Sequence, residues 1–193
     1  EMVNFSTIGG SSSEFNSYLT TLQNNNTVLV TAAGNGGTDF VGDPIGVDHF
    51  INNDIHENLS IQPSIDNQVL HVIALNSSTG EIASFSNYPG SCSDVGGGAD
   101  LACNATTMAE IQNNFISVPG TDIEAAYGAD TTSSIAYDGT SMATPTVSGG
   151  LALLLSGWDQ LTPQQAVSIL KESANNSGIY SDSATYGVGL MDM

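Results

Sequence analysis

Three short apolar segments follow the patterns of strands in a sheet. Met2 to Ser6 alternates apolar and polar residues and stops at a glycine pair, whereas Val28-Leu29-Val30 and Val69 to Leu75 are continuous apolar runs. Alternation is typical of a strand with one buried face, and a short continuous run is typical of a fully buried strand. We therefore expect a strand at each of the three segments.

A helix is predicted between the first two segments. Phe15, Tyr18, Leu19 and Leu22 recur at helical spacing within residues 14–22, behind a serine run that can cap the helix. Strand, helix and strand within about 35 residues form a βαβ unit. The sequence therefore predicts an α/β fold, with a mainly parallel sheet flanked by helices and a ligand site beyond the carboxyl ends of the strands.

The C-terminal part of the chain changes to helical patterns. From Ser141 on, apolar residues recur among many small ones, which suits a buried helix that packs closely against a sheet; the apolar ones are Met142, Val147, Leu151, Leu154 and Leu155. A second helix is predicted from Pro163 through Leu170, with Thr162 as its cap and the proline at its first position.

The charge of the chain excludes two classes of partner. Of its 193 residues, 20 are Asp or Glu and one is Lys or Arg, so the net charge is −19 at pH 7. Such a surface repels phosphate backbones and anionic lipid headgroups, and we expect no nucleic-acid and no membrane partner. The sequence contains no apolar run long enough to span a membrane and does not open with the pattern of a signal peptide.

Two stretches, residues 36–66 and about 87–114, show no sustained period and predict irregular surface segments. The second contains Cys92 and Cys103, whose near spacing suits a loop-closing disulfide in an oxidising, extracellular compartment; two independent buried thiols are the alternative. The first carries acidic residues that allow a structural calcium ion but match no EF-hand loop, so a solvated loop is the other interpretation; they are Asp39, Asp43, Asp48 and Asp54.

The candidate nucleophile is Ser141, which lies where the turn Asp138-Gly139-Thr140 enters the apolar helix. At a helix N-terminus, unpaired backbone N–H groups and the helix dipole favour a developing negative charge. A serine there can act as a nucleophile if a neighbouring base takes its proton. The alternative is that Ser141 only caps the helix.

The residues around Ser141 resemble a known family. Gly139 to Pro145, with the sequence Gly-Thr-Ser-Met-Ala-Thr-Pro, is similar to the signature around the nucleophilic serine of the subtilases. The resemblance continues in family order from end to end of the chain; the matching segments are Val3 to Gly10, Thr31 to Gly36, Gln62-Pro63-Ser64, Val72-Ile73-Ala74, Ala83 to Ser86, Val118-Pro119-Gly120 and Tyr186 to Gly189. It implies a three-layer subtilisin-like fold, with residues 1–193 as the C-terminal part of the peptidase domain.

The same resemblance implies roles for individual residues. Ser141 would attack the scissile carbonyl, while the Asn35 side-chain amide and the Ser141 backbone N–H would hold the oxyanion, with no cofactor required. The pocket for the substrate side chain before the cleaved bond would have two walls of small residues, with room for a sizeable apolar side chain; its residues are Ser6, Gly9, Ala32, Ala33 and Gly34.

The sequence departs from the family at the other two triad members. In subtilisins the acid and the base precede the pocket strand, and this chain has no Asp-Ser/Thr-Gly after an apolar strand and no His-Gly-Thr. His49, His56 and His71 are expected to be surface or packing residues. We therefore expect the N-terminal part of the same protease to supply Asp and His, and this chain alone to be inactive.

Two classes of function remain open at this stage. The first is a secreted or cell-surface serine endopeptidase whose partners are a peptide or protein substrate and its own N-terminal part. The second is a catalytically incomplete, subtilase-like binding or structural module.

Overall fold

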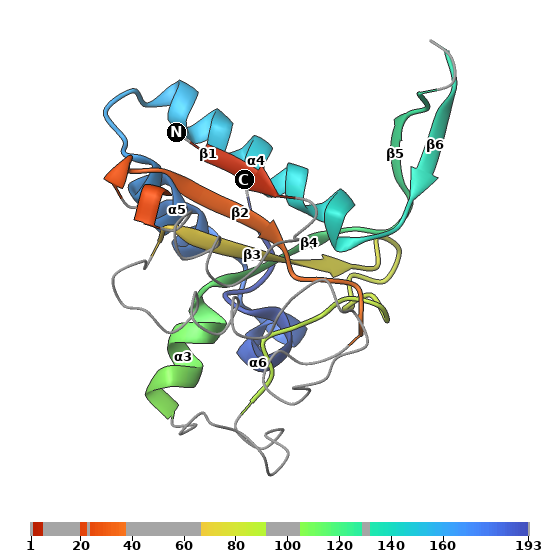
Figure 1. Cartoon of the computed structure of the whole chain (residues 1–193). Helices are drawn as coiled ribbons and strands as arrows, with labels where there is room; N and C mark the ends of the chain where they lie inside the picture. The colour runs from red at the N-terminus through yellow and green to blue at the C-terminus, as the bar shows by residue number, and fades with distance from the viewer. Residues whose placement is uncertain are drawn as a thin grey trace.

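The computed structural model describes residues 2–5, 20–22, 24–37, 67–91, 105–128 and 132–192. Four parallel strands form one sheet in chain order: β1 (Met2–Phe5), β2 (Val28–Ala32), β3 (Val69–Leu75) and β4 (Phe115–Pro119) (Figure 1). The register pairs Val3 with Leu29 between β1 and β2, and Val30 with Leu70 between β2 and β3. The three predicted strands and their parallel arrangement are confirmed.

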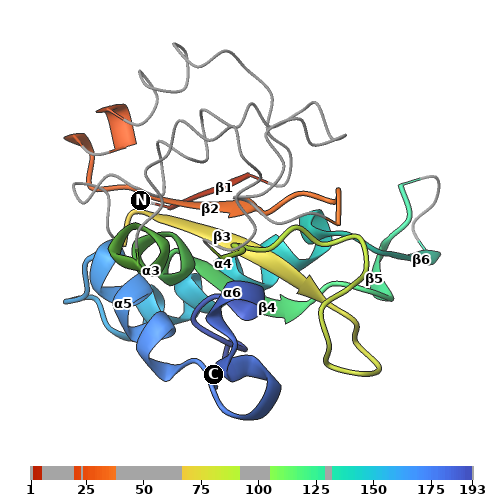
Figure 2. The ribbon, with the colours of Figure 1, turned by 90° about the horizontal axis from the view of Figure 1, so that it is seen from below.

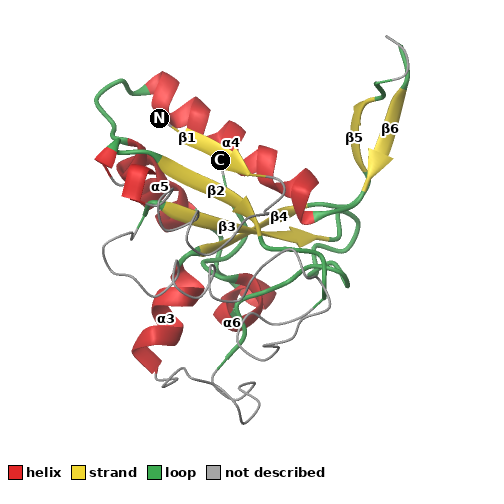
Figure 3. Cartoon of the chain, viewed as in Figure 1, coloured by secondary structure: helices red, strands yellow, loops and turns green. Residues whose placement is uncertain are grey.

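Helices cover both faces of the sheet (Figures 1 and 3). One face packs against α4 (Thr140–Gly157) and α5 (Pro163–Ser173), and the other against α3 (Ala105–Asn113) and α6 (Ser183–Tyr186), which follows the short 3-10 helix η2 (Gly178–Ser181). Successive strand residues alternate between the layers, so Val72 packs with the α4 side and Ile73 with the α3 side. The predicted three-layer α/β architecture is confirmed.

The predicted C-terminal helix begins as its sequence indicates. The Thr162 side chain accepts a hydrogen bond from Gln165 N, and the Gln165 side chain accepts one from Thr162 N, which together form a capping box. The helix runs to Ser173, three residues beyond the predicted end, and there the buried Lys171 donates a 2.9 Å hydrogen bond to Asn67 Oδ1. The chain's only Lys or Arg is thus used inside the fold.

The prediction of an irregular stretch over about residues 87–114 is wrong for its last part. Residues 105–113 form α3 within the stretch that was expected to be irregular, because burial of Met108 and Ile111 against Phe115 holds one helical face on the sheet. Two apolar anchors in nine residues are too few to show a period. Of the helix predicted over residues 14–22, residues 20–22 are described and are helical.

An antiparallel hairpin projects from the body of the molecule (Figures 1 and 2). It consists of β5 (Ile123–Ala126) and β6 (Ser134–Tyr137), and Tyr127, Ile135 and Tyr137 are exposed on or beside it. The hairpin leads directly into the turn before α4. None of the described helices is long and apolar enough to cross a membrane.

Candidate active site

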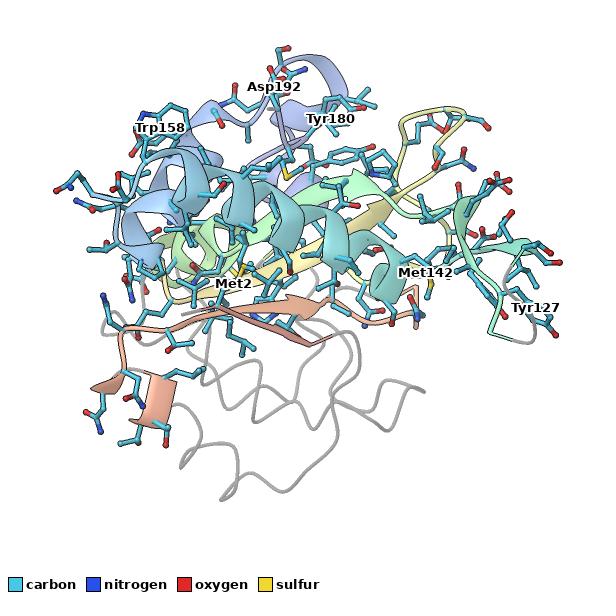
Figure 4. All side chains as sticks on the ribbon, turned by 90° about the horizontal axis from the view of Figure 1, so that it is seen from above. Met2, Tyr127, Met142, Trp158, Tyr180 and Asp192 are labelled. Carbon is cyan, nitrogen blue, oxygen red and sulfur yellow. The ribbon has the colours of Figure 1, made fainter. Side chains whose placement is uncertain are left out.

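The candidate nucleophile and oxyanion residue meet at the carboxyl-end edge of the sheet. β2 ends at Ala32, and Asn35 follows three residues later in the chain. Ser141 lies in the first turn of α4. The N–H of Gly34 donates a 3.3 Å hydrogen bond to Thr140 Oγ1, which ties the two segments together. In Figure 4, Met142 marks the start of α4, beside the segment that leaves β2.

The side chain of Asn35 is held by Thr140. Both the backbone N–H and the hydroxyl of Thr140 donate to Asn35 Oδ1, each at 2.9 Å. A backbone N–H can only donate, so the side-chain atom that faces it must be the amide oxygen. The Asn35 Nδ2 group is therefore the end of the amide that can donate to a ligand.

Gly139 provides the space that the two proposed donors share. A methyl group on Gly139 would lie 3.2 Å from Met142 Sδ, 3.7 Å from Ser141 N and 3.8 Å from Asn35 Nδ2. The two nitrogens thus border one small space, which any side chain at residue 139 would fill. A pair of donors beside one such space is the arrangement that an oxyanion hole requires.

The nucleophile turn is fixed to the sheet through Gly120. Its carbonyl accepts a 2.8 Å hydrogen bond from Gly139 N, and its N–H donates one of 2.8 Å to Leu75 O. A methyl group on Gly120 would lie 2.6 Å from Ala74 Cβ and 3.2 Å from Ala143 Cβ. The absence of a side chain at this residue therefore lets the first turn of α4 approach β3.

Comparison with known proteins identifies the family. The sequence profile of the subtilase family matches residues 4–189. The chain belongs to the subtilase family. The segment that matches Subtilisin DY of Bacillus licheniformis is 37% identical over 78 residues, which are 40% of this chain and 27% of that protein.

Solved structures show the same fold. This subtilase superimposes on the prenylagaramide maturation protease PagA with a TM-score of 0.67 and 25% identity, over 99% of this chain and 58% of that one. A cold adapted subtilisin-like serine proteinase gives a TM-score of 0.63 and 24% identity, over 98% and 53%. The chain therefore spans little more than half the length of these relatives.

Of the two predicted walls of the specificity pocket, the structure describes the residues of one. Ala32 and Ala33 are buried and Gly34 is half-buried, at the end of β2 next to Asn35. Ser6 and Gly9 lie outside the described residues; the last residue of β1, Phe5, pairs with Thr31. The pocket itself stays a prediction.

The one histidine in the described part of the subtilase lies in the core of the sheet. His71 is fully buried in β3 and stacks on the Phe115 ring, with centroids 4.6 Å apart, so it is the packing residue that the sequence predicted. His49, His56, both cysteines and the four acidic residues of the first irregular stretch lie outside the described residues. No group of three or more potential metal ligands occurs among those that are described, and the disulfide and the calcium ion stay predictions.

Thr140 is a site residue that no pattern in the sequence singled out, although it immediately precedes the nucleophile. Its hydroxyl donates to Asn35 Oδ1 and accepts a hydrogen bond from Gly34 N. The backbone N–H of Thr140 holds Oδ1 as well, so the hydroxyl supplies part of the orientation of the Asn35 amide. Thr140 is therefore a positioning residue for the oxyanion donor.

We expect Thr140→Val to lower kcat about fivefold, since a hydrogen bond of roughly 1 kcal/mol that orients the donor is lost and the shape is kept. Thr140→Ser retains the hydroxyl and should recover most of the rate. Steady-state kinetics on a peptide substrate of the complete protease would test this. Equal rates for Thr140→Val and the parent would show that the backbone N–H suffices.

Proposed function

We propose that this chain is the nucleophile-bearing part of a serine endopeptidase that hydrolyses peptide bonds through an acyl-enzyme on Ser141. One observation carries the proposal: Thr140 fixes the Asn35 amide so that Nδ2 and the Ser141 N border the same space above Gly139. A serine that only capped a helix would not require this arrangement.

The chemistry follows from these groups. Ser141 Oγ attacks the peptide carbonyl carbon while a histidine takes its proton, and the carbonyl oxygen becomes an oxyanion held by Asn35 Nδ2 and Ser141 N. The C–N bond then breaks as the histidine gives the proton to the leaving amine, and water hydrolyses the ester by the reverse sequence. The N-terminus of α4 adds the positive end of its dipole beside the oxyanion.

In this proposal, Asp and His come from the N-terminal part of the same protease domain. The sequence lacks both motifs, and the chain covers 58% of the length of PagA. Without them Ser141 is a weak nucleophile, because loss of any triad member collapses the catalytic unit. This chain by itself is then inactive.

The exposed side of α4 supports a docking place for that part. A helix with apolar residues all round its circumference is normally buried on every side. One side of α4 is nevertheless exposed, with Leu153 at 63% relative exposure; the other exposed residues at helical spacing are Pro145, Thr146, Gly149 and Ala152. This stripe, in which Thr146 is the one polar residue, starts one turn after Ser141, so a segment packed on it would lie next to the nucleophile.

The proposed substrate is a peptide or protein with a sizeable apolar side chain before the cleaved bond. The small residues Ala32 and Ala33, with Gly34, leave room for such a side chain beside Asn35. Secretion is proposed as well, because subtilases are often secreted and the two cysteines suit an oxidising compartment.

Labelling with a fluorophosphonate probe tests the proposal. The probe reacts with a serine that has a working base and an oxyanion hole, so we expect the complete protease to be labelled at the peptide that carries Ser141. Peptide mapping by mass spectrometry identifies the residue. This chain alone should show no label, and adding the N-terminal part should restore it.

Heat-denatured protease is the control, because unfolding destroys the oxyanion hole and should abolish the label. Failure of the complete, folded protease to react would contradict an endopeptidase and favour the binding or structural module.

A further inference from the structure

Asn35 and Gly36 form the only Asn-Gly pair in the sequence. Such a pair can lose ammonia without an enzyme, because a glycine offers no side chain to hinder ring closure. Gly34 and Gly37 have positive φ angles (101° and 65°), which favour glycine, whereas the φ of Gly36 is not positive. The glycine that makes the pair reactive is therefore not demanded by the turn geometry at that residue.

The reaction would remove the oxyanion donor itself. The backbone nitrogen of Gly36 loses its proton to solvent and attacks Asn35 Cγ, and the Cγ–Nδ2 bond breaks to release ammonia and a five-membered succinimide. Water then opens the ring and leaves aspartate or isoaspartate, with no oxidation or reduction. A carboxylate would replace the Nδ2 donor with a negative charge that only accepts hydrogen bonds.

The attacking nitrogen is held in the folded chain. Gly36 N–H donates a 2.9 Å hydrogen bond to Asn87 Oδ1. Asn87 is itself fixed, because its N–H donates to Gly34 O at 3.0 Å, and Gly37 N donates to Phe85 O at 2.7 Å. The segment 85–87 thus runs beside residues 34–37. It presents Asn87 Oδ1 to the N–H of Gly36, which must lose its proton for the reaction to occur.

The hydrogen bond between Gly36 N–H and Asn87 controls the deamidation rate, because the hydrogen bonds made by the Asn35 side chain favour deamidation. The two Thr140 donors on Asn35 Oδ1 withdraw electrons from Cγ and make it easier to attack. Protection must therefore come from the nucleophile, whose proton and position are held by Asn87. We infer that Asn35 is a site of spontaneous deamidation and that Asn87 protects it by binding the Gly36 N–H.

The test measures deamidation directly by mass. The complete protease with Ser141→Ala, which excludes self-digestion, is incubated in mildly alkaline buffer, and the Asn35 peptide is followed by mass spectrometry for a gain of about one dalton. Asn87→Ala should deamidate about fivefold faster, the ratio expected for loss of one hydrogen bond of ordinary net strength. This readout does not depend on the proposed function.

Two further variants separate the causes. Asn87→Asp keeps a side-chain oxygen that accepts from Gly36 N–H and should restore slow deamidation. Gly36→Ala combined with Asn87→Ala should also be slow, because a side chain hinders ring closure. Equal rates for the parent and Asn87→Ala would overturn the inference, and so would a fast Asn87→Asp variant.

The effect on activity rests on the proposed function. In the active, complete protease, the Asn87→Ala variant should lose activity over time in parallel with its mass gain. Deamidation without loss of activity would leave the modification site intact and contradict the oxyanion role of Asn35 instead.

Discussion

Asn35→Ala should lower kcat of the complete protease by roughly 10²–10³-fold with little change in KM, because the lost donor acts on the oxyanion and not on the bound substrate. The magnitude is the one known for the corresponding asparagine of a subtilisin. It depends here on the two 2.9 Å hydrogen bonds from Thr140, which leave Nδ2 as the end that can donate. Steady-state kinetics on a peptide substrate measures both constants.

A surface asparagine provides the matched control. Asn176 is exposed near η2, and no hydrogen bond joins it to the nucleophile turn among the described residues, so Asn176→Ala should retain the parental kcat. Asn35→Asp should be at least as slow as Asn35→Ala, since a carboxylate opposes the oxyanion. A rise in KM with unchanged kcat in Asn35→Ala would assign the residue to substrate binding and contradict the oxyanion role.

Gly187→Ala should reduce the free energy of unfolding by about 2–5 kcal/mol, from backbone strain and overpacking together. Gly187 ends α6 with φ 64°, where a residue with a side chain is strained. Its added methyl group would also overlap the carbonyl oxygen of Phe115, which accepts a 2.9 Å hydrogen bond from Val188 N. Equilibrium denaturation in urea measures the change.

Gly178→Ala separates the two contributions. Gly178 has nearly the same φ, 61°, but a methyl group there would meet nothing within 4 Å. We expect this variant to lose only about 1–2 kcal/mol, the cost of the left-handed backbone. If both variants lost the same stability, the contact between Gly187 and Phe115 would not matter.

The elements that the sequence predicted carry their signals locally. β2 and β3 are continuous apolar runs, and α5 opens with a threonine, a proline and a glutamine that close a capping box within four residues. The segment at Ser141 combines a glycine turn with an apolar helix. Each of these patterns is complete within one segment, so no knowledge of neighbouring segments was needed.

The elements that were missed depend on partners. α3 is helical because Met108 and Ile111 pack on Phe115, and its remaining residues show no apolar period. The β5–β6 hairpin pairs strands whose residues are mostly exposed, so burial imposed no alternation on them. The exposed stripe of α4 also has no sequence signal, because its apolar residues resemble those of a buried helix.

The sequence by itself determined the parallel α/β class, the family and the chemical types at the site: a serine at a helix start behind a glycine-containing turn, and an asparagine after a buried strand. Only the tertiary structure decided that Thr140 orients Asn35 across 105 positions of the chain and that Asn87 binds Gly36 across 51. The reason is physical: these hydrogen bonds exist because parallel strands bring their carboxyl ends to one edge of the sheet. A linear sequence names the donors and acceptors but does not show which of them that edge brings together.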